Sequence, residues 1–485
     1  MKHRQSISSY WSILLILVLT PLLLWAAITI LPTHDDWAGT TKPSFEPFFI
    51  KERFLFYGYH WRPFDTMVGY VAGLNPQTLY PAFNHCLVVI GHLVNSLLIF
   101  KLITAIGLNK NAANIATAFF FITPATMATV LAVDSQNQTY ALMWDIIAFL
   151  IYIKQKKDKY ILWTISIFLA TWSKENGLMW AVICPILAYG FNFIEKKQLR
   201  KDLLIGICIM VVYALAIWLL PKQMIIHPEY VPDPLKTISG FIKFFFSSFI
   251  TVDYIWLLHQ PSRNLLLASI TVILTIPFMY YIYIRQLKLI KDRKIVCTLI
   301  SLLIAAAPHI FTVFSMMHTY GGLVFVVLII AISVNNYSYQ CKAIIISFAF
   351  FALSAFAINI HLWHESYLSG LTGKQMAIDA IQKTGEPVDS VYVIIIEDDY
   401  PKLSSFCVIP SDAFGWGRAT QYETNYDWPK VVNDTIITRN KQSFQTANQL
   451  AALQLKDGTY NCVWIVDHKN ITVIRNDIYD KEKLH

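Results

Sequence analysis

Long apolar runs recur along most of this chain and constrain its fold more than any other feature. Most measure roughly 17 to 22 residues and are long enough to cross about 30 Å of hydrocarbon as a helix. Hydrophobic residues make up 55% of the sequence and charged residues only 14%, and the mean hydropathy is +0.47. A soluble globular domain is far less apolar. The chain is therefore predicted to be a polytopic α-helical membrane protein.

We count about eleven such runs, two of which are short for a full transmembrane helix. The first, from Trp11 to Leu31, is interpreted as a retained helix because no small-x-small cleavage site precedes His34. The others are expected near residues 83–104, 113–133, 139–153, 160–172, 177–194, 203–220, 265–284, 295–314, 320–334 and 342–362.

Basic residues gather in loops that fall on one side of this arrangement. The clusters occupy residues 154–159, 195–201 and 285–294. Because lysine and arginine in short loops stay cytoplasmic, the loop at Asp134, the turn at 174–175 and the tail beyond Trp363 are predicted to be extracytoplasmic. The formal charge of +8 is thus mainly a topology signal, and we expect no nucleic-acid partner.

The chain divides into a membrane module, residues 1–363, and a tail, residues 364–485, in which apolar runs shorten to strand length. The tail is predicted to form a small α/β domain, and such a domain would cover or shape the acceptor side of a site on the same face. Its cysteines, Cys407 and Cys462, lie where a disulfide is chemically permitted, and the sequence leaves that bridge open. Strands are expected at 390–397, 462–467 and 471–475, and helices at 374–383 and 444–455.

Two long extracytoplasmic loops, residues 32–82 and 221–264, interrupt the membrane module. Each contains an amphipathic, aromatic-rich stretch, Phe45–Tyr59 in the first and Phe241–Trp256 in the second. Such stretches are typical of short helices that lie in the membrane interface with their rings at headgroup level.

Two adjacent carboxylates, Asp35 and Asp36, directly follow the first span on the predicted outer side. Charged groups at the membrane boundary, away from the basic loops, indicate a function there. The same loop ends in His60-Trp61-Arg62-Pro63, which adds an imidazole and a guanidinium to the outer face.

The second span carries a polar stripe. His85, His92, Asn95 and Ser96 share one helical face, and lipid cannot satisfy such groups, so they must face the bundle or a wet cavity. For His92, Asn95 and Ser96, hydrogen bonding between helices and a role in a site are equally consistent with the pattern. His85 lies nearer the outer end, which favours a role in a site.

A charged turn, Ser173-Lys174-Glu175-Asn176-Gly177, joins two spans with very little loop around it. Taken alone, it is equally consistent with a solvated hairpin. Asp134 occupies a comparable short outer loop and by itself indicates little.

Five motifs occur in a fixed order along this part of the chain. They are the carboxylate pair in HDDW (34–37), the element YHWRPF (59–64), a second span that begins Asn84-His85 and continues to His92 and Asn95, FITP (121–124) before the loop at Asp134, and WSKENG (172–177). Together they resemble the GT-C superfamily of membrane glycosyltransferases. The resemblance is strongest to the protein O-mannosyltransferases that carry tetratricopeptide repeats and to their bacterial relatives, and it covers residues 10–200 approximately.

The resemblance implies transfer of a sugar from a polyprenyl-phosphate donor, presented from the outer leaflet, to an acceptor hydroxyl with inversion. Asp35 and Asp36 would divide two roles, one as the base and the other orienting donor, acceptor or metal. Metal dependence stays open; a divalent cation such as Mg²⁺ or Mn²⁺, if one takes part, would bind these two carboxylates. The remaining implied donor-phosphate or substrate-binding residues are Arg62, Lys174, Glu175, His60, His85 and Asp134.

This chain departs from the pattern in two places. No tetratricopeptide array follows the membrane part, and Trp61 interrupts the family's usual Tyr-Arg-Pro motif. The acceptor is therefore left open between a glycan, a lipid and a protein. We expect a GT-C-like module in a bacterial cytoplasmic membrane, surrounded by membrane lipids, with its site and tail in the periplasm.

Two other functions fit part of the same evidence. A transporter or flippase of a lipid-linked saccharide would also have many spans and intramembrane polar groups, although no repeated pair of broken helices is evident. Asp145, within the fourth span, is the nearest candidate for ion coupling. A noncatalytic subunit is the third possibility, and the retained Asp35, Asp36 and Arg62 argue against it.

Overall fold

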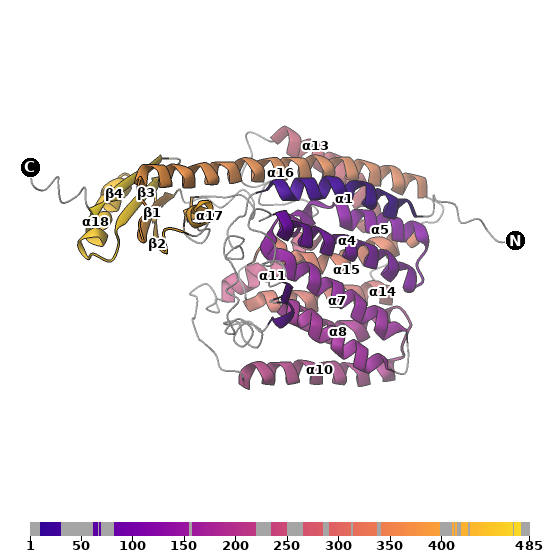
Figure 1. The fold of residues 1–485 in the computed structure, drawn as a ribbon. Coiled ribbons are helices and arrows are strands. Elements are labelled where there is room, and N and C mark those ends of the chain that lie inside the picture. Colours follow the sequence, from indigo (N-terminus) through magenta and orange to yellow (C-terminus); the bar gives the residue numbers. More distant parts are fainter. Residues whose placement is uncertain are drawn as a thin grey trace, which may run out of the picture.

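In the computed structural model, a bundle of long helices is followed by a small sheet (Figure 1). The structure describes residues 10–30, 62–65, 67–68, 82–154, 158–219, 234–249, 265–284, 291–311, 314–336, 341–397, 410–411, 413–414, 419–424, 427–468 and 470–476. Asp35, Asp36 and His60 lie outside these residues, as does the first amphipathic stretch, Phe45–Tyr59.

Each of the eleven predicted spans contains a helix of the bundle. The helices are α1 (Trp11–Thr29), α4 (Ala82–Ala105), α5 (Lys110–Ile122), α6 (Met127–Val130), α7 (Gln136–Ile153), α8 (Lys159–Ser173), α9 (Trp180–Gly190), α10 (Lys196–Leu219), α11 (Pro234–Phe249), α13 (Leu265–Met279), α14 (Arg293–Ala306), α15 (Thr319–Asn335) and α16 (Cys341–Thr384). Short helical turns extend several of them: η4 (Pro124–Thr126), η5 (Val133–Ser135), η6 (Glu175–Met179), η8 (Tyr280–Ile284), η10 (Ala307–Phe311) and η11 (Met316–His318).

Within the described ranges, five helices are individually long and apolar enough to cross a membrane, namely α1, α4, α10, α16 and α15 with its preceding turn. Helix α5 and the η4–α6 segment together are also long and apolar enough for a span, and they are bent by 51° at the break between them, as in a broken span or a re-entrant loop. The bend has a local cause. Pro124 has no backbone N–H and disfavours a helical conformation at Thr123, which is extended.

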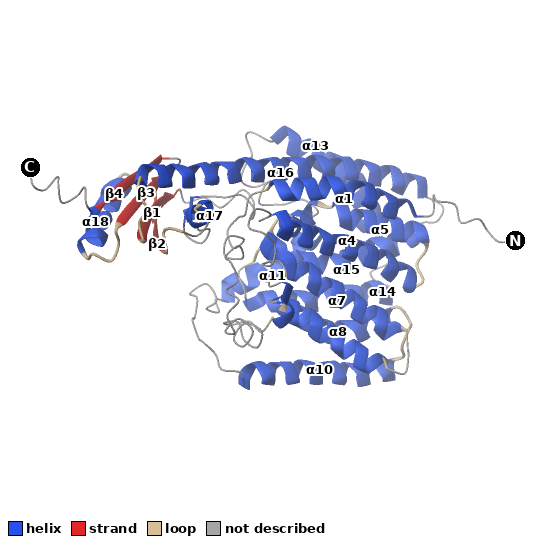
Figure 2. Ribbon diagram, in the orientation of Figure 1, coloured by secondary structure: helices blue, strands red, loops and turns tan. Residues whose placement is uncertain are grey.

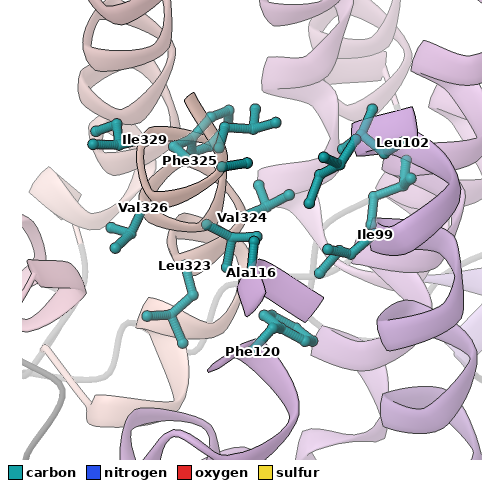
Figure 3. Packing of buried hydrophobic residues seen from close by; sticks show 14 of the residues in the cluster. Ile99, Leu102, Ala116, Phe120, Leu323, Val324, Phe325, Val326 and Ile329 are labelled. Carbon is teal, nitrogen blue, oxygen red and sulfur yellow. The ribbon is translucent and has the colours of Figure 1, made fainter. Parts of the chain in front are cut away.

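The central helix of the bundle is α15. Its side chains are buried on every face from Leu323 to Ile332, which is the pattern of a helix enclosed by other helices. Figure 3 shows Val324 and Leu323 facing Ala116 and Phe120 of α5, with Ile99 of α4 close by. The outer helices instead leave large apolar side chains exposed to the surroundings, as Trp218 of α10 does.

The polar stripe of α4 is a hydrogen-bonded contact between helices. The Asn95 amide donates to Thr139 O (2.8 Å) and to the Tyr320 hydroxyl (3.2 Å). His92 Nδ1 lies 2.9 Å from that hydroxyl, and His92 Nε2 lies 3.2 Å from Phe121 O. A carbonyl can only accept, so Nε2 carries the proton and Nδ1 accepts from Tyr320. Two functions were possible for the polar residues of this stripe, hydrogen bonding between helices or a role in a site. For His92 and Asn95 the structure supports hydrogen bonding between helices.

The last helix, α16, has 44 residues and is therefore about 66 Å long at 1.5 Å per residue. It packs against α13 in the bundle and ends beside the sheet (Figures 1 and 2). The Trp363 indole donates to Ala26 O (3.1 Å) and to the Thr29 hydroxyl (3.0 Å), and its ring lies 5.1 Å from that of Trp25. This aromatic pair is typical of the membrane–water interface. The helix passes the expected domain division at 363/364 without a break.

The sheet has the strand order β2-β1-β3-β4. Strand β1 (Ser390–Glu397) is parallel to β2 (Val431–Thr438) and to β3 (Cys462–Asp467), whereas β4 (Asn470–Arg475) is antiparallel to β3. The predicted strands match β1, β3 and β4. Strand β2 was not expected, because its side chains are mostly exposed and mixed in polarity, as is usual for an edge strand.

Helices cover both faces of this sheet. Helix α18 (Ser443–Lys456) packs on the face with Ile394 and Val463, and the last turns of α16 pack on the face with Val393 and Trp464. Burial on both faces explains the continuous apolar run in β1. The short helix α17 (Ala419–Glu423) contributes Ala419 to the α16 side. The two expected tail helices are confirmed as the end of α16 and as α18.

The second amphipathic stretch is described up to Phe249, where α11 ends. This helix packs against α15, with Phe244 and Ser248 buried. A Cβ atom added at Gly322 would lie 2.8 Å from the Phe244 ring, so only glycine allows this close approach.

Helix α10 depends on one close contact of the same kind. A Cβ atom at Gly206 would lie 2.2 Å from Ala181 O of α9. We expect Gly206→Leu to force the two helices apart and to lower stability by about 1–3 kcal/mol. Thermal unfolding in detergent measures this effect. Val211→Leu, on the exposed face of the same helix, is the control and should change little; equal stability of both variants would contradict the packing.

Candidate active site

A bidentate ion pair joins the end of the first outer loop to the charged turn. Arg62 donates from Nε to Glu175 Oε1 and from Nη2 to Glu175 Oε2, both at 2.7 Å. The two side chains are 16% and 32% exposed, so solvent screens the pair only in part. Sequence analysis predicted both residues for the site, and the structure brings them into contact.

Arg62 is positioned by the residues that follow it. Phe64 packs edge-on against two rings of α7, with ring centroids 6.2 Å from Tyr140 and 5.9 Å from Trp144. Such edge contacts are favourable beyond the area that they bury. Phe64 therefore attaches this short segment to the bundle and directs the guanidinium toward Glu175.

The charged turn owes its shape to Gly177. Helix α8 ends at Ser173, Lys174 is extended, and its N–H donates to Ala170 O at 2.9 Å. A Cβ atom at Gly177 would lie 2.7 Å from the carbonyl carbon of Ala170. Only glycine allows the chain to fold back so closely, and this hairpin holds Lys174 and Glu175 at the end of two helices.

Two histidines that sequence analysis missed belong to the same cluster. His309 of η10 stacks on Phe244, with ring centroids 4.7 Å apart, and lies 4.7 Å from the ring of His318 of η11. The charge of Lys174 acts on both imidazoles, and that of Arg62 acts on His318. His309 is 4% exposed, and within the described part of the chain neither of its ring nitrogens has a hydrogen-bond partner.

These histidines carry no recognisable motif. The usable signal was topological, since His309 and His318 flank the predicted outer ends of the spans 295–314 and 320–334. The backbone of the turn before α15 also determines the position of His318, whose Nδ1 accepts from Ser315 N at 3.2 Å.

The loop at Asp134 reaches this cluster through its neighbours. Ser135 Oγ lies 3.6 Å from the Met317 sulfur, and Thr129 Oγ1 donates to Met317 O at 3.3 Å. The backbone of Asp134 belongs to η5, and its side chain lies outside what the structure describes. Thus η5 packs beside His318, as expected for a loop on the same face.

An amide pair lies next to the charged turn. Asn176, in η6, donates from Nδ2 to Gln138 Oε1 of α7 at 3.5 Å. Gln138 is 2% exposed. Asn176 belongs to the charged turn but was not predicted to be a site residue, and neither was Gln138.

His85 occupies a different place. It is completely buried on α4, beside the backbone of Ile30 at the end of α1. Nothing in the described ranges joins it to Arg62 or Lys174. Its proposed substrate contact therefore remains a prediction, as do those of His60, Asp35 and Asp36.

No three His, Cys, Asp or Glu side chains of the described residues gather into a metal site. Asp35 and Asp36 lie outside those residues. The hypothesis that they bind a divalent cation is therefore still open.

No protein-family model matches the sequence, and no curated protein matches it. Among solved structures, the chain is similar to ArnT from Cupriavidus metallidurans, in a crystal structure with undecaprenyl phosphate bound. The two chains are 11% identical with a TM-score of 0.50, and the alignment covers 96% of this chain and 97% of ArnT. The chain has the fold of ArnT.

This similarity extends over the membrane helices and the small sheet together. It confirms the expected architecture, a polytopic helical membrane protein with a small C-terminal α/β unit. At 11% identity it is evidence of fold alone, so the chemistry has to be argued from this chain's own residues.

The Arg62–Glu175 contact can be tested by a double-mutant cycle. We expect Arg62→Gln and Glu175→Gln each to destabilise the protein, with a coupling energy of about 1–3 kcal/mol from thermal unfolding, because the two charge-assisted hydrogen bonds require both partners. The exposed pair Lys430–Asp389, 3.5 Å apart, provides the control and should show almost no coupling. Additive effects at Arg62 and Glu175 would refute the contact.

Proposed function

We propose that this protein is a membrane glycosyltransferase of the GT-C type. It transfers a sugar from a polyprenyl-phosphate donor to an acceptor hydroxyl on the extracytoplasmic side, with inversion. The observation that supports this most is the cluster of Arg62, Lys174, His309 and His318, which comes from four separate segments of the chain. The ArnT-like fold adds support, because ArnT was crystallised with a polyprenyl phosphate.

The cluster suits a phosphate leaving group. When the acceptor oxygen bonds to the anomeric carbon, the bond from that carbon to the phosphate oxygen breaks, and negative charge grows on the polyprenyl phosphate. A nearby ammonium and guanidinium stabilise that charge without reorganisation. Lys174 and Arg62 would have this role, and Glu175 would be a positioning residue that holds the guanidinium.

The acceptor hydroxyl must lose a proton in the same step. Asp35 or Asp36 would accept it, and such general-base assistance contributes roughly 10²- to 10⁴-fold. The other carboxylate would orient the donor, the acceptor or a divalent cation. These assignments derive from the sequence resemblance, and they agree with the position of the two aspartates directly after α1, whose end lies beside His85, another predicted site residue.

The alternative of a transporter or flippase has one observation in its favour. Asp145 is buried in α7, and its Oδ1 has no hydrogen-bond partner among the described residues. Against this alternative, both ring nitrogens of His92 are engaged by protein groups, so His92 itself is not free to bind a passing substrate. Saccharide-lipid movement across proteoliposomes without transfer would favour the alternative.

We expect Lys174→Met to lower transfer by about 10²- to 10³-fold, because a preorganised charge on the leaving group is lost. The measurement is release of free polyprenyl phosphate, followed by mass spectrometry, from a panel of polyprenyl-phosphate sugars. Lys342→Met, an exposed lysine at the start of α16, is the matched control and should retain activity. Normal release by Lys174→Met would exclude this lysine from the site.

The two aspartates should differ in the same assay. Replacing the base by asparagine should abolish transfer, whereas replacing its partner should leave part of the activity. Near-normal activity in both Asp35→Asn and Asp36→Asn would refute the assignment.

Sidedness requires a separate test. We propose that the protein lies in a bacterial cytoplasmic membrane with the site and residues 364–485 in the periplasm. A phosphatase that is active only outside the cytoplasm, fused after His485, should be active; activity only of a cytoplasmic reporter at this position would reverse the topology.

A further inference from the structure

The amide pair beside the charged turn is only half satisfied. The contact from Asn176 Nδ2 to Gln138 Oε1 leaves Gln138 Nε2 and Asn176 Oδ1 buried, and neither has a hydrogen-bond partner among the described residues. The oxygen and nitrogen of each amide could be assigned the other way round. If both amides are flipped, they still contact each other, and one donor and one acceptor are again left without partners. Other buried polar atoms of the described residues also have no partner, but here a donor and an acceptor lie on two amides in contact with each other, which suits a polar ligand that pairs with both.

Opposite Asn176, Gly321 of α15 leaves room for a side chain among the described residues. A Cβ atom at Gly321 of α15 would touch only Asn176 Nδ2 within the described part of the structure, at 3.8 Å. Gly322, one residue later, is closely packed instead, since a Cβ atom there would lie 2.8 Å from the Phe244 ring. The first glycine of this pair therefore faces the amides, and the second faces α11.

The chemistry of the two atoms restricts the ligand. A hydroxyl group both accepts and donates, so one hydroxyl can accept from Gln138 Nε2 and donate to Asn176 Oδ1. An ionised phosphate only accepts and would leave Asn176 Oδ1 unpaired. A hydroxyl group, the polar group that sugars carry in greatest number, fits both atoms.

The neighbouring residues indicate which molecule carries it. Asn176 follows Lys174 and Glu175 in the chain, and Glu175 binds Arg62. If these groups hold the donor phosphate, the sugar bonded to that phosphate lies within a few ångströms of the amides.

We propose that Gln138 and Asn176 bind a hydroxyl group of the transferred sugar and thereby determine which sugar the enzyme accepts. This inference rests on the proposed function. It assigns to the two amides a specificity role, distinct from the charge stabilisation by Lys174 and Arg62.

The test uses a donor sugar that the wild type transfers, its monodeoxy analogues and bare polyprenyl phosphate. Binding is measured in detergent without acceptor. We expect the wild type to bind one deoxy donor about tenfold more weakly than the full sugar, because one hydroxyl contact is lost. Gln138→Met and Asn176→Leu should weaken binding of the full sugar donor by a similar factor. Their affinities for that deoxy donor and for bare polyprenyl phosphate should equal those of the wild type.

Two further variants separate specificity from folding. Gly321→Leu keeps both amides and fills the space beside Asn176. It should therefore weaken binding of the sugar donor and leave binding of bare polyprenyl phosphate unchanged. Gln198→Met removes a partly buried amide whose Nε2 donates to the Tyr160 hydroxyl and to Asp202, both at 2.7 Å, in the basic cluster 195–201 that is predicted to lie on the cytoplasmic side. It should leave the preference among donors unchanged.

The outcomes distinguish the two proposals. If the wild type transfers no sugar and binds no polyprenyl phosphate, the proposed function fails and this inference with it. If transfer occurs but the amide variants discriminate among deoxy donors as the wild type does, only this inference fails. It also fails if the variants alter the KM for the acceptor and not donor binding.

Discussion

The structure depends on one constraint, that hydrocarbon offers no partner to a polar group. Around α4 and α15, Asn95, Tyr320 and His92 form a chain of hydrogen bonds that ends on Phe121 O, although Asn95 Oδ1 has no partner among the described residues. This chain connects three helices. Because α15 is buried on all faces, the other helices are arranged around it.

At one end of the bundle the same constraint is relaxed. Gln138 at the start of α7, Asn176 in η6 and His309 in η10 have buried nitrogen or oxygen atoms without a partner among the described residues. Lys174 and the Arg62–Glu175 ion pair lie beside them. Rigid glycine contacts, at Gly177 and Gly322, keep these groups in place. Unpaired groups on a rigid frame are typical of a site prepared for a polar ligand.

The position of the small sheet depends on a second rigid element, helix α16. Helix α16 continues from the bundle into the hydrophobic core below β1 and β3, so no hinge separates the two parts at residue 363. Its Trp363, bound to α1, marks the level at which the helix leaves the membrane. The sequence predicted the sheet's buried strands well, because burial on both faces leaves a continuous apolar run, and it missed β2, whose exposed side chains follow no such pattern.

The sequence by itself determined that most of the chain is a helical membrane protein followed by a small α/β unit, and it predicted the side of each loop and the site residues Arg62, Lys174 and Glu175, because hydropathy, charge and short motifs are local properties. Only the tertiary structure decided which of these groups meet. It paired Arg62 with Glu175 across more than a hundred residues, added His309 and His318, and separated His92 from the site by satisfying both of its nitrogens. The physical reason is that contacts between helices depend on packing and on hydrogen-bond partners from distant segments, which no local pattern encodes.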